Sequence, residues 1–336
     1  MAVISVTERR DASQGDNHRL RFSPTEKREA DAADPADGAN GRTRRGNAYL
    51  VAERTRRMQG RGYTREPFSP RRRATVDAMR MAGRRNDVHG LVTFDVTEAR
   101  RRIREREAET GERLSFTAFV AYCLARAVAA DPRVQAYRDW RGRLVVFDDA
   151  DVMVVVEREV DGERVGLPHV VRAANRRSLR SIHDEIRTAQ RAPEPTHRNR
   201  WLNLAARLPG PVRRLFYRLP RRAPGYWKRA AGTVAVSSVG MFGTGGGWAV
   251  TPTNYALQLT VGGVSRRAVV VEDGDGGDGG GTREGEGRVE TREFLHVTAT
   301  FDHDVVDGAP AARFLERLRE LVESARGLDG DEGASG

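Results

Sequence analysis

The chain has 336 residues, with 58 Lys and Arg against 47 Asp and Glu, so its formal net charge is +11. Hydrophobic residues make up 38% of it, which is below the usual globular share and indicates that part of the chain lies outside any core. The single cysteine, Cys123, excludes a disulfide framework, a cysteine zinc site and a CxxC redox pair. No stretch approaches the ~20 apolar residues of a membrane span, and the early charges are not typical of a signal peptide, so we expect a cytoplasmic protein.

Composition divides the chain into a central domain and two tails. Residues 1–66 are rich in Arg, Asp, Gly and Asn without periodicity, which predicts a disordered, basic and polar extension. We expect ordered sequence over residues 67–327 and a disordered tail over 328–336. Inside the domain, the Gly-rich residues 273–288 predict a long flexible hairpin tip. Residues 191–231 form a basic insertion with a net charge of +10.

Hydrophobic periodicity predicts alternating helices and strands along the domain. In chain order these are a helix over 71–82, a strand over 91–96, helices over 96–110 and 114–131, strands over 144–147, 152–157 and 163–171, a helix over 175–190, strands over 233–240, 255–264, 268–272 and 294–303, and a helix over 311–327. Consecutive β segments in the second half lack an intervening helix. The pattern therefore favours an α/β two-layer sandwich, in which a mixed β-sheet carries helices mainly on one face.

Two of these elements have distinct signatures. In the helix over 114–131, Ser115 or Thr117 is a plausible N-cap and Asp131-Pro132 is the stop. Cys123 lies in its apolar pattern, which indicates a buried small hydrophobe. The run VMVVVE at 152–157 is apolar on both faces, as is typical of a central strand.

The stretch FDHDVVDGAPAARFLERL at 301–318 carries the strongest indication of chemistry. His303 and Asp307 are separated by three residues at the end of an apolar strand, and Gly308 and a helix follow. A strand that ends in histidine presents an imidazole at the sheet edge, where a pocket can form. An aspartate nearby can fix the turn and, through a cation, steady the loop that holds the histidine.

This stretch resembles the active-site signature, HxxxDG followed by AARFL, of the dihydrolipoamide acyltransferase catalytic domain of 2-oxoacid dehydrogenase complexes. AVSSVGMFGTGG at 235–246 is similar to the serine-containing segment of that family, and PFSPRRRATVDAM at 67–79 resembles its opening. LSFTAFVAYCLARAVAADPRVQAY and GLPHVVRAANRRSLRSIHDEI also occur in the expected order. The resemblance implies a chloramphenicol acetyltransferase-like fold, because that enzyme shares the architecture.

The resemblance also implies an acyltransferase that moves an acyl group between coenzyme A and a thiol acceptor of the dihydrolipoamide type. His303 matches the general base, which removes the thiol proton as sulfur attacks a thioester carbonyl. Ser237 matches the hydroxyl that stabilises the oxyanion, an interaction worth about 3 kcal/mol; Ser238 is the competing serine. Asp307 matches the position that steadies the active-site turn.

The resemblance also implies which residues support the active-site turn and how the chains assemble. Arg72 matches an arginine that pairs with the aspartate in the related acetyltransferase, with Arg71 and Arg73 as alternatives in register. Gly308 completes the supporting turn. The active site of this family lies between subunits of a trimer, so the resemblance implies a homotrimer in which His303 and Ser237 come from neighbouring chains.

The sequence departs from the family in several places. Neither a lipoyl domain nor a subunit-binding domain is visible, so a lipoyl group is expected only in trans, on a separate protein. Asp304 stands where the complex-bound enzymes commonly have Arg, and TPT at 251–253 replaces an NPP-like turn. The glycines of GTGGGW at 243–248 lack a phosphate-loop pattern and are interpreted as letting the backbone turn beside the active site.

The remaining expectations concern binding partners and alternative functions. We expect no metal and no nucleic acid, since no recognised nucleic-acid module is present. The basic insertion 191–231 is either a solvated surface or a contact with an anionic membrane, an acidic carrier protein or coenzyme A phosphates. Two other functions stay open: a non-catalytic scaffold that keeps the fold, and a transferase that uses acyl-coenzyme A to modify a small-molecule amine or hydroxyl. The histidines other than His303 are interpreted as structural or given no role: His89, His169, His18, His183, His197 and His296.

Overall fold

A computed structural model describes residues 70–160, 163–191, 208–212, 215, 223–238, 246–271 and 288–328. These residues belong to one compact unit that begins at Pro67. The predicted N-terminal extension, most of the basic insertion, residues 273–287 and the tail from 329 lie outside the described residues, and their predicted character stays a prediction. None of the described helices combines the length and apolar character needed to cross a membrane.

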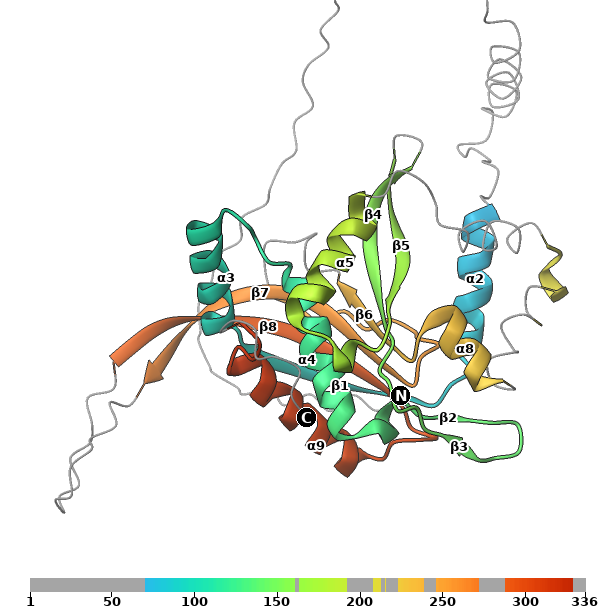
Figure 1. The fold of residues 1–336 in the computed structure, drawn as a ribbon. Helices are drawn as coiled ribbons and strands as arrows, with labels where there is room; N and C mark the ends of the chain where they lie inside the picture. The colour runs from blue at the N-terminus through green and yellow to red at the C-terminus, as the bar shows by residue number, and fades with distance from the viewer. Residues whose placement is uncertain are drawn as a thin grey trace, which may run out of the picture. The chain divides into compact units, whose positions relative to one another are not determined.

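The described elements alternate in type as predicted (Figure 1). In chain order they are α2 (Pro70–Ala82), β1 (Asp87–Asp95), α3 (Thr97–Thr110), α4 (Phe116–Ala130), the 3₁₀ turn η1 (Pro132–Gln135), β2 (Tyr137–Arg138), β3 (Leu144–Val145), β4 (Val152–Val160), β5 (Glu163–Val171), the 3₁₀ turn η2 (Ala174–Arg176), α5 (Leu179–Arg191), α8 (Pro224–Ala231), β6 (Val234–Ser238), β7 (Leu257–Val271), β8 (Arg288–Asp302) and α9 (Gly308–Glu323).

Six strands form one mixed sheet in the order β1-β8-β7-β6-β4-β5. β6 runs parallel to β4 and β7, whereas the remaining pairs are antiparallel. β2 and β3 form a separate two-stranded hairpin. β4 has a strand on both sides, as its apolar run predicts, and β5 is an edge strand, which is where a strand tolerates a residue such as Pro168 that lacks an N–H.

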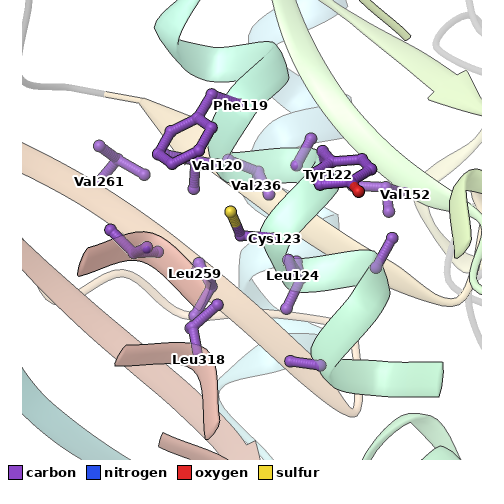
Figure 2. Close-up of a cluster of buried hydrophobic side chains, with 14 of the residues drawn as sticks. Phe119, Val120, Tyr122, Cys123, Leu124, Val152, Val236, Leu259, Val261 and Leu318 are labelled. Carbon is purple, nitrogen blue, oxygen red and sulfur yellow. The ribbon is translucent and has the colours of Figure 1, made fainter. Parts of the chain in front are cut away.

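The core lies between one face of the sheet and the helices α3, α4, α5 and α9, with α4 at its centre (Figure 1). Figure 2 shows Cys123 of α4 surrounded by side chains of β6, β7 and α9, among them Val236, Leu259 and Leu318. Cys123 is fully buried, as predicted. Successive residues of a strand point to opposite faces of the sheet. The residues that point toward the helices are apolar, and the residues between them form the opposite face.

Local signals explain where several elements begin and end. Ser115 caps α4 by accepting a hydrogen bond from the backbone N–H of Ala118, and the helix stops before Asp131-Pro132, as predicted. α5 begins four residues later than predicted because η2 precedes it. The segments predicted as two strands over 255–264 and 268–272 form one continuous strand, β7, with a register irregularity between Val261 and Val264 that absorbs the Gly-Gly pair.

Candidate active site

His303 follows the last residue of β8, in the turn that leads to α9. Its side chain is 47% exposed, and its Nδ1 lies 3.9 Å from Oδ1 of Asp307, which is beyond hydrogen-bond length. Asp307 occupies the N-cap position of α9 without a side-chain capping bond, and its side chain is 84% exposed. The turn thus presents an accessible imidazole beside an exposed carboxylate at one end of the sheet.

The two predicted supporting residues differ in their surroundings. Arg72 is exposed on α2, and no contact between Arg72 and Asp307 occurs among the described residues of the single chain, so their pairing stays a prediction. Gly308 is the first residue of α9, and a Cβ at this position would meet no atom within 4 Å. Steric need in the single chain therefore does not explain this glycine.

A different arginine anchors the turn. Arg85 lies between α2 and β1, and its Nη2 donates to Oδ2 of Asp302 at 2.6 Å. Asp302 immediately precedes His303, whose own backbone N–H donates to the carbonyl of Asn86 at 2.8 Å. Sequence reasoning missed Arg85 because it is one of several arginines in an unremarkable run and its partner lies 217 positions away.

Ser237 lies in β6 and faces away from the helices. Val234 and Val236 point into the core, so alternation places Ser237 on the opposite face, which we call the open face, and Ser238 on the helix side. Both serines are half-buried. Since the two hydroxyls point to opposite faces of the sheet, a site on the open face can use Ser237 but not the competing Ser238.

The single chain does not bring Ser237 and His303 together. Ser237 pairs with Thr260, which pairs in turn with Thr298. His303 lies five residues beyond Thr298 and two strands from β6, which separates it from Ser237 by about 17 Å along the strands and about 10 Å across them. A site that uses both residues therefore needs two copies of the chain.

Polar side chains surround Ser237 on the open face. Nε2 of Gln258 donates to the hydroxyls of Thr251 and Thr260, at 2.8 and 3.2 Å, and these two hydroxyls are 3.1 Å apart. The hydroxyl of Thr298 is buried and has no hydrogen-bond partner among the described residues. Alternation in LQLT and VTAT, which places polar residues on one face of β7 and β8, was the sequence signal for this cluster.

Gly246 and Gly247, at the end of the glycine-rich run, pack closely against the open face. His296 is buried there: its Nδ1–H donates to the Gly263 carbonyl at 3.0 Å, and Arg267 Nη2 donates to its Nε2 at 2.9 Å. Trp248 contacts it edge-on, with 4.6 Å between the ring centroids. A Cβ on Gly246 would lie 2.2 Å from the His296 ring, so close packing requires this glycine. The structure thus gives His296, for which no role was predicted, a structural one.

A second unassigned histidine lies in an acidic group. The ligand atoms of Glu112, His183 and Asp184 lie within 4.8 Å of one another. Nδ1 of His183 already accepts the backbone N–H of Ser115, so in the neutral ring Nε2 carries the proton, and Glu112 pairs with Arg180. These contacts fit an anchor between α5 and the start of α4 better than a metal site.

Comparison with known proteins places this geometry in a family. The family described as "2-oxoacid dehydrogenases acyltransferase (catalytic domain)" matches residues 60–198 and 229–328. The dihydrolipoyllysine-residue acetyltransferase component of the pyruvate dehydrogenase complex of Zymomonas mobilis is 25% identical over 250 residues, which cover 73% of this chain and 47% of that protein. The human dihydrolipoyllysine-residue succinyltransferase component of the 2-oxoglutarate dehydrogenase complex is 29% identical over 97 residues, covering 29% of this chain and 18% of that protein. The chain thus spans less than half the length of these curated relatives.

Solved structures show the same fold. A probable dihydrolipoamide acetyltransferase from Listeria monocytogenes matches with a TM-score of 0.57 and 18% identity, over 80% of this chain and 98% of that one. The cubic core of a pyruvate dehydrogenase multienzyme complex matches with a TM-score of 0.52 and 16% identity, over 79% of this chain and 93% of that one. The predicted α/β two-layer architecture is confirmed. The chain belongs to the 2-oxoacid dehydrogenase acyltransferase (catalytic domain) family.

Proposed function

We propose that the protein is an acyltransferase that moves an acyl group between coenzyme A and a thiol acceptor of the dihydrolipoamide type. The observation that carries this proposal is His303: a half-exposed imidazole on an anchored turn at the sheet edge, beside Asp307, in a chain of this family. A solved Azotobacter vinelandii dihydrolipoamide acetyltransferase was investigated for the roles of a serine, a histidine and an asparagine in its catalytic mechanism, and its histidine and asparagine are four positions apart, as are His303 and Asp307.

In the proposed reaction His303 acts as general base. Nδ1 is the ring nitrogen nearer Asp307, which leaves Nε2 to take the proton from the attacking thiol. Sulfur bonds to the thioester carbonyl carbon, and the carbonyl oxygen becomes negative. The intermediate then collapses by breaking its bond to the original sulfur, which leaves as a thiol after recovering the proton from His303. One thiol is exchanged for another, so no oxidant or reductant is consumed.

Ser237 is proposed to donate a hydrogen bond to that oxyanion. A preorganised donor of this kind is worth about 3 kcal/mol of transition-state stabilisation. Since one chain keeps Ser237 and His303 apart, the donor and the base come from different copies of a homotrimer in this proposal.

The ribbon formed by the outer halves of β7 and β8 supports such an assembly. β6 pairs with β7 only as far as Val261, and β1 pairs with β8 only from Phe294 onward, so beyond these residues no described strand pairs with the outer edges of the ribbon. Val270 and Val289, which pair across the ribbon, are 65% and 68% exposed. Open strand edges and exposed apolar side chains favour pairing with another copy.

A thiol-release assay with several acyl-coenzyme A donors tests the proposal. We expect transfer to dihydrolipoamide, and we expect His303→Ala to lose most of the rate while the oligomeric state is kept. His169→Ala is the matched control, because His169 pairs with Glu185 at the far edge of the sheet. A wild-type rate in His303→Ala would refute the assignment of the base.

The same assay separates the alternatives. Transfer to amines or hydroxyls but not to dihydrolipoamide would change the acceptor class while keeping the enzyme. Absence of transfer to every acceptor, together with salt-sensitive binding to anionic vesicles or an acidic protein, would favour a scaffold. A lipoyl group supplied by a separate protein remains part of the proposal, and adding a lipoylated protein as acceptor tests it.

A further inference from the structure

Arg85 makes an unusually complete set of contacts at the corner that holds His303. Its side chain is 7% exposed. It donates to Oδ1 of Asp87 at 3.2 Å and to Oδ2 of Asp302 at 2.6 Å. It also donates to the backbone carbonyls of Asn254 at 3.4 Å and Tyr255 at 3.0 Å. One side chain thus connects the start of β1, the segment before β7 and the end of β8.

Together with the next residue, Arg85 holds three consecutive residues of the turn. Arg85 binds the Asp302 side chain, the Asn86 carbonyl accepts the His303 N–H at 2.8 Å, and the Asn86 amide donates to Oδ1 of Asp304 at 2.9 Å. Oδ1 of Asp302 accepts the Asp304 N–H at 3.2 Å. The Asp302 carboxylate therefore links Arg85 to the backbone on the far side of His303.

We propose that Arg85 is a positioning residue for His303, acting through Asp302; this inference rests on the function proposed above. A guanidinium presents five donors in a rigid fork, which lets it serve two carboxylates and two carbonyls at once, and an ammonium group cannot reproduce that geometry. Removing it leaves the largely buried Asp302 carboxylate without its charged partner, which loosens the turn that carries the imidazole.

The effect of such a loss falls on the chemical step. His303 must stand within hydrogen-bond reach of the thiol proton, and a misplacement of ~1 Å costs up to roughly 100-fold in rate. The hydrogen bonds of Arg85 all go to the corner that holds His303: to Asp87, Asp302 and the carbonyls of Asn254 and Tyr255. A positioning role therefore predicts a fall in kcat without a matching rise in KM.

Variants of Arg85 and of its exposed neighbour test this role: Arg85→Met, Arg85→Lys and the control Arg84→Ala. Arg84 is the exposed neighbour, so its removal deletes the same charge without touching the corner. We expect Arg85→Met to lower kcat by up to roughly 100-fold at unchanged KM. Arg85→Lys should recover part of that loss, and Arg84→Ala should behave as wild type. Asp302→Asn should lower kcat similarly. Combining it with Arg85→Met should cause little further loss of kcat.

Amide hydrogen exchange of the peptide that contains His303 gives a readout independent of activity. Exchange should accelerate in Arg85→Met but not in Arg84→Ala. Wild-type kcat and unchanged exchange in Arg85→Met would overturn the inference, as would a loss seen only in KM. If the wild type itself transfers no acyl group, the proposed function fails and so does the positioning of a base, even where exchange shows that Arg85 anchors the turn. If Arg85→Met does not fold, Arg85→Lys and Asp302→Asn carry the same comparison.

Discussion

Nδ1 of His183 accepts the backbone N–H of Ser115 at 2.9 Å, which ties α5 to the residue that caps α4. This bond requires an unprotonated Nδ1. Burial lowers the pKa of His183 below its ordinary value; Arg187 lowers it further, whereas Asp184 and Glu112 act in the opposite direction. The folded protein therefore favours the neutral ring.

Acid should weaken the fold through His183. Because its pKa is lower in the folded chain than the ~6.5 of an unfolded one, the unfolded state binds more protons between these two values. The free energy of unfolding therefore falls as pH falls through that window. Urea unfolding at about pH 7.5 and about pH 5.5 measures this difference, and His183→Gln should reduce it. A pH dependence equal to that of the wild type in His183→Gln would contradict the assignment.

Gly246→Ala should destabilise the protein. The added Cβ would lie 2.2 Å from the ring of His296, which is buried and fixed by Gly263 and Arg267 and so cannot give way. Overpacking of this kind costs about 1–3 kcal/mol. Urea unfolding compares it with Gly225→Ala, where a Cβ meets no atom within 4 Å. Equal stability of the two variants would show that the ring is displaced at no cost.

Cys123 should be unreactive in the folded protein. Burial raises the pKa of its thiol, so little thiolate forms, and the sulfur lies beneath α9 with its S–H directed to the Leu321 carbonyl. A chromogenic thiol reagent should label Cys123 as soon as the protein is mixed with it in denaturant. It should not label Cys123 in the folded protein. Rapid native labelling would contradict the packing of this core. The sole cysteine therefore adds no background to a thiol-release assay.

Val270→Glu should weaken self-association. Val270 and Val289 lie opposite each other on the ribbon and are largely exposed. A carboxylate introduced there opposes burial against a second copy, since an unpaired charge is costly to desolvate. In sedimentation, the variant should form smaller species than the wild type at equal concentration. The variant monomer should still unfold cooperatively on heating, which shows that the fold is kept. An unaltered assembly would place the interface elsewhere.

Elements with strong local signals could be predicted from the sequence. The helix α4 carries its own cap at Ser115 and its own stop at Asp131-Pro132, so neighbouring residues decide its bounds. β7 was predicted as two strands, 255–264 and 268–272, because the polar run Ser265-Arg266-Arg267 separates two apolar segments. In the sheet these three residues pair with β8 like their neighbours, and the ladder also continues past the register irregularity at Gly262-Gly263.

Site residues likewise divide into those with a local sequence signal and those that depend on distant segments. His303 and Asp307 share one turn, so their spacing predicts that they are neighbours. Arg85 could not be found this way, because its role depends on a carboxylate and two carbonyls from distant segments. The packing of His296 is equally non-local, since it depends on Gly246 and Trp248. The separation of Ser237 from His303 follows from strand order, which no local pattern specifies.

The contacts of Arg85 also bear on how the protein matures. Its partners lie 169, 170 and 217 positions along the chain, so this corner closes only after β1 has joined β8 and β7 has been added beside it. Long-range closures of this kind come late in folding, since loop entropy is lost before the contacts form. A nascent or partly folded chain therefore holds no ordered His303, and chemical competence is coupled to completion of the whole sheet.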